Sequence, residues 1–342
     1  MPYAISYASL HDGGREGVKF SVIIPFKAVN AHVRETVPYV LKLNNTDWEL
    51  ILVPNEGMAS EWPDDRIRVL ASGRVGPGAK RDLAAKVALG EILVFLDDDS
   101  YPRADILDVA RSYFRDPGVV ALGGPGITPP QDGFWQRVSG AVFLSKLSGG
   151  APERYVPVGG VREIQDWPSV NLMVRKADFL SIGGFNTDYW PGEDTKLCLE
   201  LIKKTGRKIL YVPELVVWHH RRAGLPGHLK QIGAYGLHRG FFAKEYPETS
   251  RKPVYFIPSV FVLFTALSLF SPLLPAPLKA LVALGWALYA MALAKALRDF
   301  LAHEKPVVAL CALWYTFCTH LVYGIRFIQG LVFTERLVST LR

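Results

Sequence analysis

Residues 90–102 read GEILVFLDDDSYP, and this stretch decides the fold. Its apolar part, residues 92–96, has the length of a strand and ends directly in three carboxylates, Asp97, Asp98 and Asp99. A continuous apolar run bounded by turn residues predicts a strand that is buried on both faces. Because unpaired carboxylates repel one another and are costly to bury, three of them at the end of this strand indicate a nearby cation.

The spacing of the aspartates predicts what the cation is. Asp97 and Asp99 are two residues apart, so on an extended chain their side chains point to the same side. Oxygen ligands of this kind suit a hard divalent metal, and such a metal can bridge to a diphosphate. The alternative is an acidic turn that caps the helix expected after Pro102, and this stretch alone leaves both interpretations open.

Composition narrows the class of protein. The chain has 342 residues and a formal net charge of +7, and its long apolar stretches follow residue 252. A basic balance of this kind fits a protein that lies against anionic lipid and handles an anionic substrate, and no nucleic-acid module stands out, so no nucleic-acid partner is expected. Three cysteines without framework spacing (Cys198, Cys311 and Cys318) indicate reduced thiols and a cytosolic catalytic part.

Strand-like and helical segments alternate through the first third of the chain. Strands are expected at residues 19–25, 48–53, 67–70 and 92–96, and helices at 34–43 and 79–89. This order predicts an α/β protein with a mostly parallel sheet and helices on both faces. Ligands bind beyond the carboxyl ends of such strands, which places Pro25, Glu56 and residues 97–99 along one rim.

Two shorter motifs suggest further parts of a site. A glycine-rich loop at residues 73–78 leads into a helix that carries Lys80 and Arg81, and helix amides with two cations suit a diphosphate. A solvated basic helix start would look the same. Glu193 and Asp194 open an amphipathic helix at residues 195–205, where carboxylates also favour the helix dipole, so helix capping is a second explanation for them.

Taken in order, these motifs resemble glycosyltransferase family 2, the inverting enzymes of GT-A fold. The resemblance covers about residues 19–222. It rests on SVIIP at 21–25, ILVPNEG at 51–57, AKRDLAAKVALGEILVFLDDD at 79–99, IGGF at 182–185 and GED at 192–194.

The resemblance implies a nucleotide-sugar donor, Mg²⁺ or Mn²⁺, and roles for individual residues. Glu56 would face the nucleobase and ribose, Arg81 would approach the diphosphate, and Asp194 would be the general base that deprotonates the acceptor. The implied donor-binding residues are Pro25, Glu56, Lys80, Arg81, Asp97 and Asp98, the implied metal ligands are Asp97, Asp99 and His219, and the implied acceptor-side residues are Gly184, Trp190 and Glu193.

Two departures from the family pattern matter. Asn55 and Glu56 stand where the family usually has two aspartates, which leaves the nucleobase open. Residues 231–235 read QIGAY where processive synthases carry Gln-x-x-Arg-Trp, so a single-addition enzyme is expected more than a processive polysaccharide synthase. A non-catalytic membrane scaffold that binds sugar nucleotides is the alternative outside enzymes.

The remainder of the chain predicts membrane attachment. A polar N-terminal arm (residues 1–18) and the glycosyltransferase domain (19–222) are followed by a basic, aromatic-rich segment (223–253) that reads as interfacial or as an ordinary surface helix. Apolar segments at 255–274, 278–297 and 307–323 predict about three transmembrane helices within residues 254–342, since about 20 residues span the hydrocarbon.

The charge of the two links predicts the orientation. Residues 271–277 carry no charge, whereas residues 298–306 carry Arg298 and Lys305, which puts the second link and the catalytic domain on the cytoplasmic face. Whether the third segment spans is left open, because Gly324 and Arg326 interrupt it. The expected activity is sugar transfer with inversion to a polyprenyl phosphate or polyprenyl-linked glycan, in the synthesis of cell-surface polysaccharide or glycolipid.

Overall fold

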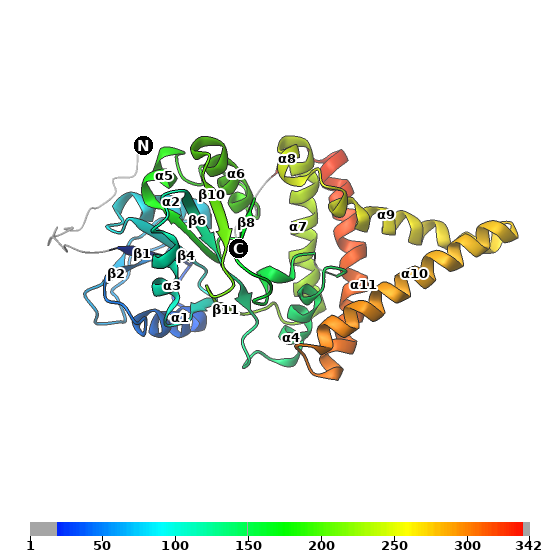
Figure 1. Ribbon diagram of the computed structural model, residues 1–342, viewed down its shortest axis with the longest axis horizontal. Helices are drawn as coiled ribbons and strands as arrows, with labels where there is room; N and C mark the ends of the chain where they lie inside the picture. The colour runs from blue at the N-terminus through cyan, green and yellow to red at the C-terminus, as the bar shows by residue number, and fades with distance from the viewer. Residues whose placement is uncertain (1–18, 149, 338–342) are drawn as a thin grey trace.

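The computed structural model describes residues 19–148 and 150–337, so the arm predicted for residues 1–18 lies outside the described residues. An α/β domain forms one half of the molecule, and a set of long helices forms the other (Figure 1). The 92–96 run forms the strand β4 (Ile92–Leu96), and all five of its residues are buried, as its unbroken apolar sequence predicts.

The central sheet is mostly parallel, as predicted. Neighbouring strands pair in parallel except where β9 lies between β4 and β6 and where β8 forms the far edge next to β10. In order across the sheet the strands are β3 (Ile67–Val69), β2 (Trp48–Val53), β1 (Phe20–Pro25), β4, β9 (Asn171–Arg175), β6 (Val119–Gly123), β10 (Lys208–Tyr211) and β8 (Arg162–Ile164).

Helices cover both faces of this sheet, also as predicted. Apolar side chains of α1 (Ala31–Leu41) and α3 (Ile106–Tyr113) pack against one face, and those of α2 (Pro77–Val87), α5 (Lys176–Ser181) and α6 (Glu193–Thr205) pack against the other (Figure 1). The Asn30 side chain starts α1 by accepting a 2.9 Å bond from the Val33 amide. These layers leave the carboxyl ends of β1, β2 and β4 at one open rim.

A small second sheet joins the rim from a distant part of the chain. The strand β11 (Val217–His219) pairs antiparallel with β5 (Ser100–Pro102) and parallel with β7 (Gly126–Ile127). In this register His219 lies opposite Ser100, the residue that follows the three aspartates. The sheet therefore carries a histidine from late in the sequence to the end of β4.

Two long helices that pack side by side join the α/β domain to the apolar part of the chain. The helix α7 (Leu225–Glu245) lies beside α11 (Pro306–Ile328), and the short helices α4 (Phe134–Ala141) and α8 (Pro247–Ser250) flank them (Figure 1). A Cβ added to Gly240 would lie 2.1 Å from the Phe327 carbonyl oxygen, and one added to Gly330 would lie 2.0 Å from the Leu237 carbonyl oxygen. Glycine thus lets the two backbones touch, as small residues do between packed helices.

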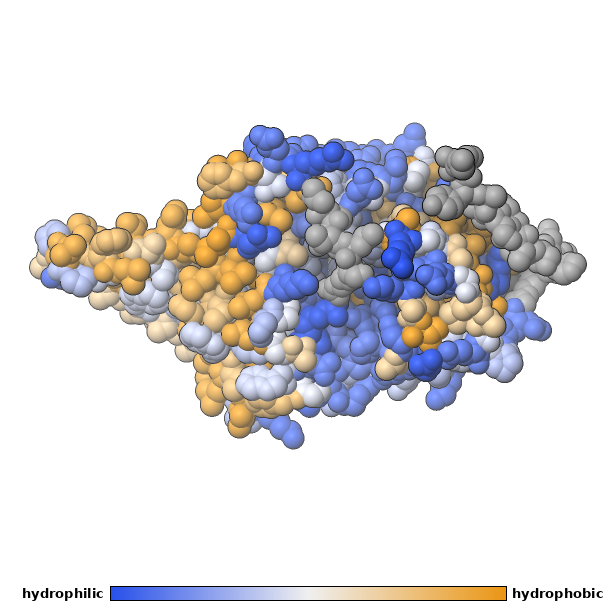
Figure 2. All heavy atoms as spheres, turned by 180° about the vertical axis from the view of Figure 1, so that it is seen from behind, coloured by the Kyte–Doolittle hydropathy of each residue, from blue (hydrophilic) through white to orange (hydrophobic). Residues whose placement is uncertain are grey.

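The apolar helices form a projecting hairpin. The helix α9 (Pro253–Ser268) and the helix α10 (Ala276–Leu301) extend away from the α/β domain (Figure 1), and apolar side chains cover this projection (Figure 2). Among the described residues, two helices are long and apolar enough to cross a membrane, Ala276–Leu301 and Pro306–Phe333. The helix α9 has only 16 residues, because a 3-10 turn at Ser271–Leu273 interrupts the first predicted segment.

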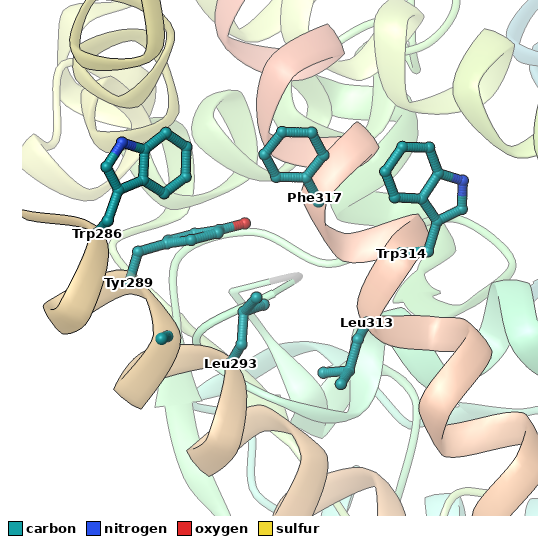
Figure 3. Close-up of a pocket in the computed structure, with 7 residues that line it drawn as sticks. Trp286, Tyr289, Leu293, Leu313, Trp314 and Phe317 are labelled. Atoms are coloured by element: carbon teal, nitrogen blue, oxygen red, sulfur yellow. The ribbon is translucent and has the colours of Figure 1, made fainter. Parts of the chain in front are cut away.

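A cavity of about 420 Å³ lies between α10 and α11. Figure 3 shows its lining, which comes from Trp286, Tyr289, Ala290, Leu293, Leu313, Trp314 and Phe317. At the other end of α10, Arg137 of α4 pairs with Glu304 at 2.6 Å, and the Ser145 hydroxyl donates to Asp299 at 2.7 Å. The link between α10 and α11 is therefore fastened to the α/β domain, whereas the link between α9 and α10 lies at the far tip.

Candidate active site

Asp97, Asp99 and His219 form a cluster with the chemistry of a metal site. Each of the three side chains offers one ligand atom, and these atoms all lie within 4.8 Å of one another. The two carboxylates come from the end of β4, and the imidazole comes from β11 through its pairing with β5. Two carboxylate oxygens and one imidazole nitrogen suit Mn²⁺ or Mg²⁺, so the residues present fit the predicted ion.

Asp99 is held as a carboxylate in spite of its burial. Burial opposes ionisation, but His219 at 3.3 Å and Arg222 at 3.5 Å outweigh it and hold the pKa of Asp99 below its ordinary value. A charged carboxylate is the form that a metal binds. The charged state of Asp99 is therefore the one that a metal ligand needs.

Arg81 connects Asp97 to the start of α6. Its guanidinium is buried, donates to Asp97, and lies 3.9 Å from the Glu193 carboxylate. Its Nε and Nη1 atoms make no hydrogen bond to any residue that the structure describes. Buried donors are normally satisfied, and of these two atoms Nη1 faces the Glu193 carboxylate.

Lys80, which was predicted to bind the donor, joins the ends of two strands. Its ammonium donates to the Phe26 carbonyl at 2.5 Å and to the Asn55 side-chain oxygen at 2.6 Å. Burial lowers the pKa of Lys80 to about 8. Its donors therefore already have partners in the protein, and Lys80 fixes the distance between the β1 and β2 ends of the rim.

The other predicted donor residues lie on the same rim with different exposure. Pro25 is buried at the end of β1, and Glu56 is exposed in the loop after β2. Asp98 turns toward α1, where the Asn30 amide donates to its carboxylate at 2.8 Å. Burial and the neighbouring Asp99 raise the pKa of Asp98. The three consecutive aspartates thus have different surroundings.

Asp194 lies in the first turn of α6, next to a second carboxylate. Its two oxygens accept bonds from the Ser169 amide at 3.3 Å and from the Thr195 amide at 2.8 Å. Burial and the charge of Asp166 raise the pKa of Asp194, while Arg154 opposes them. A carboxylate whose pKa lies above its ordinary value is the better proton acceptor.

A cluster of charges that the sequence did not reveal supports Asp194. Arg154 pairs with Asp166 at 2.6 Å, Arg239 of α7 lies 3.6 Å from the same carboxylate, and the Thr195 hydroxyl donates to it at 3.2 Å. Burial works against the charge of Asp166, but the two arginines lower its pKa to about 2. These residues come from separate parts of the chain and share no motif, so no sequence pattern could have grouped them.

The predicted acceptor-side residues surround the start of α6. Burial and Asp194 raise the pKa of Glu193 to about 8, and the nearby Arg81 opposes them. Gly184 has a φ of +76° and packs on Asp82 of α2, which accepts bonds from the Phe185 and Asn186 amides. Gly184 is thus needed for a tight turn before α6. Trp190 is half-buried and precedes a cis peptide bond to Pro191.

A small cavity of about 50 Å³ lies between the metal-type cluster and the charges around Asp194. His219 and Arg221 line one side of it, and Arg154 lines another. Gln231 and Tyr235 of α7 also contribute to the lining, so a helix of the apolar half of the molecule forms part of the site. No motif or spacing in the sequence connects these residues.

His220 does not belong to the cluster, although it follows His219. Its Nε2 atom lies 2.8 Å from Glu35 of α1, and its Nδ1 atom bonds to Asp132. The bond to Asp132 is the main reason that the pKa of His220 rises to about 9. Of these two adjacent histidines, His219 is the one that the structure brings to Asp97 and Asp99.

Comparisons with known proteins agree with this fold. Residues 21–168 match the family model of glycosyl transferase family 2. The pre-mycofactocin glycosyltransferase of Mycobacterium tuberculosis is 29% identical over 173 residues, which cover 51% of this chain and 36% of that protein. A Methanococcus voltae dolichyl N-acetyl-alpha-D-glucosaminyl phosphate 3-beta-D-2,3-diacetamido-2,3-dideoxy-beta-D-glucuronosyltransferase is 25% identical over 166 residues, 47% of this chain and 50% of that protein.

The match therefore spans about a third to a half of the length of these relatives. The similarity to a solved structure covers nearly the whole chain. The mannosyltransferase PcManGT from Pyrobaculum calidifontis, in complex with GDP-Man and Mn²⁺, covers 93% of this chain and 88% of its own at 18% identity and a TM-score of 0.60. Residues 21–168 therefore match the glycosyl transferase family 2 domain, and the chain has the GT-A fold.

Proposed function

We propose that this protein is a membrane-bound, metal-dependent, inverting glycosyltransferase that moves a sugar from a nucleotide-sugar donor to a lipid-linked acceptor. The acceptor would be a polyprenyl phosphate or a polyprenyl-linked glycan. The observation that carries the proposal is the single rim on which Asp97, Asp99 and His219 lie beside Arg81, which in turn lies 3.9 Å from Glu193, the neighbour of Asp194. Donor-side and acceptor-side groups thus meet at one place.

On the donor side, Asp97, Asp99 and His219 would hold Mn²⁺ or Mg²⁺. When bound, this ion supplies Lewis-acid stabilisation to the leaving diphosphate. Arg81 would supply two buried N–H donors to the same diphosphate, since its Nε and Nη1 have no hydrogen-bond partner among the described residues. The mannosyltransferase with the same fold was solved with GDP-Man and Mn²⁺, which supports this donor class.

On the acceptor side, Asp194 would take the proton from the attacking hydroxyl. General-base catalysis of this kind contributes about 10²–10⁴-fold in rate. The raised pKa of Asp194 fits the role, and the Ser169 and Thr195 amides would keep the carboxylate in place. A base on one side of the sugar and a leaving group on the other give inversion of the anomeric configuration.

The position of the apolar helices favours an acceptor in the membrane. The α7 residues Gln231 and Tyr235 line the small cavity beside His219, and α7 packs on α11. Arg298 and Lys305 flank the link that is fastened to the α/β domain, so the domain and the charged link would share the cytoplasmic face. The Methanococcus voltae relative is named for a dolichyl-linked substrate, which supports a lipid-linked acceptor here.

The test is sugar transfer by the full chain in lipid nanodiscs. A panel of UDP-, GDP- and dTDP-sugars would be combined with a short-chain polyprenyl phosphate and Mn²⁺ or Mg²⁺, and products would be followed by mass spectrometry. One donor should give a single-sugar glycolipid, and NMR should show the inverted anomer. Polymeric product would instead identify a processive synthase, and donor binding without any product would identify a non-catalytic scaffold.

A further inference from the structure

A second group of metal-type ligands lies beside the candidate active site. His219 is the last residue of β11, and successive residues of an extended chain point to opposite sides. His220 therefore turns away from Asp99 and toward α1, where it faces His32 and Glu35. These two residues are three apart on a helix, so they share one face of it.

The ligand atoms of this group are spaced much like the ligand atoms around a bound ion. One ligand atom each from His32, Glu35 and His220 lies within 4.8 Å of the other two, and the His220 Nε2 to Glu35 Oε2 distance is 2.8 Å. Ligands at about 2.1 Å from a tetrahedral zinc ion are roughly 3.4 Å apart. His32 is exposed, so its ring can turn toward the other two without disturbing packed neighbours.

The residues around the group have the arrangement of a metal site's supporting shell. Nδ1 of His220, the ring nitrogen that would not bind the ion, is bonded to the buried carboxylate of Asp132. Asp132 is itself fixed, because its other oxygen accepts a 3.2 Å bond from the Arg221 amide. The free oxygen of Glu35 accepts a 3.2 Å bond from Gln131. A carboxylate that orients a ligating histidine through its second nitrogen is a recurrent feature of zinc sites.

We propose that His32, Glu35 and His220 bind one zinc ion at a site separate from Asp97, Asp99 and His219. Two imidazoles and one carboxylate suit zinc, whereas Mg²⁺ and Mn²⁺ favour oxygen ligands. On binding, the ion takes the place of the proton that His220 Nε2 shares with Glu35, and water completes the coordination. The proposal concerns metal binding alone and does not depend on the transferase activity.

The consequence of such an ion would be mechanical. It would tie α1 to the chain segment that carries His219. The start of α1 also supplies Asn30, which holds Asp98 at 2.8 Å. A zinc ion at this place would therefore fix two sides of the rim relative to each other, and it would raise the melting temperature.

The experiment is a zinc titration of the full chain in detergent, after removal of metals with EDTA and dialysis, without nucleotide. Isothermal titration calorimetry should show a tight zinc site that persists in Asp99→Asn, and the melting temperature should rise with zinc. His32→Ala and Glu35→Gln should each weaken binding at least tenfold and abolish the rise. The His303→Ala control removes an exposed histidine elsewhere, and Asp99→Asn removes a ligand of the first cluster, so both should keep the site.

Three results would overturn the proposal. The first is the lack of stoichiometric zinc in the wild-type chain, in which case His220 is a protonated bridge between Asp132 and Glu35. The second is unchanged binding in both His32→Ala and Glu35→Gln, with circular dichroism showing that the variants are folded. The third is loss of zinc in Asp99→Asn alone, which would place the ion in the first cluster.

Discussion

His219 Nε2 lies 3.3 Å from Asp99 Oδ1, although 120 residues separate the two in the sequence. The contact exists because β11 pairs with β5, which directly follows the aspartates. An imidazole and a carboxylate at this distance either form an ion pair or share a metal. The two possibilities respond differently to loss of the carboxylate charge.

Replacing Asp99 by Asn should abolish metal-dependent donor binding. The substitution keeps the shape of the side chain but removes a charged oxygen ligand, so we expect the affinity for Mn²⁺ with a nucleotide sugar to fall at least tenfold. Calorimetry with and without the metal measures this. Asp108→Asn removes an exposed carboxylate from α3 and should bind as the wild type does. Full transfer by Asp99→Asn in excess chelator would rule out the metal role.

Replacing Asp194 by Asn should separate a general base from a helix cap. Loss of a base should reduce turnover about 10²–10⁴-fold with little change in folding. Loss of a cap costs about 0.5–2 kcal/mol of stability and leaves the chemistry intact. We expect normal donor affinity and melting temperature with collapsed turnover. An early melting transition together with normal turnover per folded molecule would move the base elsewhere.

Replacing Glu193 by Gln should flatten the pH dependence of stability. The pKa of Glu193 rises to about 8 in the folded chain, so the folded state holds a proton that the unfolded state has released above its ordinary pKa of 4.5. The stability that this group contributes is therefore complete below pH 4.5 and is lost as the pH rises through 8. Gln has no such proton to lose.

Melting curves of the wild type and of Glu193→Gln between pH 5 and 8.5 test this in one buffer series. The wild type should lose more of its melting temperature over that range than the variant does. Turnover should change less than in Asp194→Asn. Parallel curves would mean that Arg81, 3.9 Å away, keeps Glu193 charged throughout.

Replacing Gly240 by Ala should destabilise the chain, although alanine favours helices by about 1 kcal/mol. The added Cβ would lie 2.1 Å from the Phe327 carbonyl oxygen and 2.9 Å from the Leu331 amide nitrogen, and backbone atoms cannot move aside as a side chain can. Overpacking of this kind costs about 1–3 kcal/mol. Gly227→Ala in the same helix, where the added Cβ would lie 3.6 Å from the Arg222 Cβ, is the matched control. A higher melting temperature for Gly240→Ala would show that α7 and α11 are not in contact.

Membrane attachment should resist alkaline carbonate. The helices Ala276–Leu301 and Pro306–Phe333 are long and apolar enough to span, and about 20 apolar residues make insertion effectively irreversible. After expression in cells, the full chain should stay in the membrane pellet and leave it only with detergent. Its appearance in the carbonate supernatant would mean that these helices lie on the surface.

The sequence predicted most of the α/β domain because its signals are local. The run at 92–96 and the carboxylates behind it need no distant partner to be recognised, and the rim of Pro25, Glu56 and Asp97 follows from the rule for parallel sheets. The direction of β9 could not be predicted, since a short strand such as NLMVR carries no signal that distinguishes parallel from antiparallel pairing. The shortness of α9 was also missed, because an apolar composition continues through the turn that ends it.

The partners of individual side chains could not be predicted from the sequence either. Lys80 carries a positive charge at the expected place, but its bonds to Phe26 and Asn55 could not be predicted from that charge. Asp166 belongs to no motif in the sequence. Its ion pairs with Arg154 and Arg239 form only in the folded chain. Partners that meet only after folding leave no trace in spacing or periodicity.

The bond network of Asp166 bears on how this protein can be taken apart. Arg239, which lies 3.6 Å from Asp166, belongs to α7, and its guanidinium rests 4.7 Å from the ring centre of Tyr255 on α9. A fragment that ends at residue 222, where the sequence alone would place a boundary, would lack both side chains and leave the half-buried Asp166 carboxylate with one arginine fewer. Chimeras that exchange the apolar helices must therefore keep α7 with the α/β domain. The reason is that α7 supplies one of the two arginines at Asp166, so it belongs to both halves of the molecule.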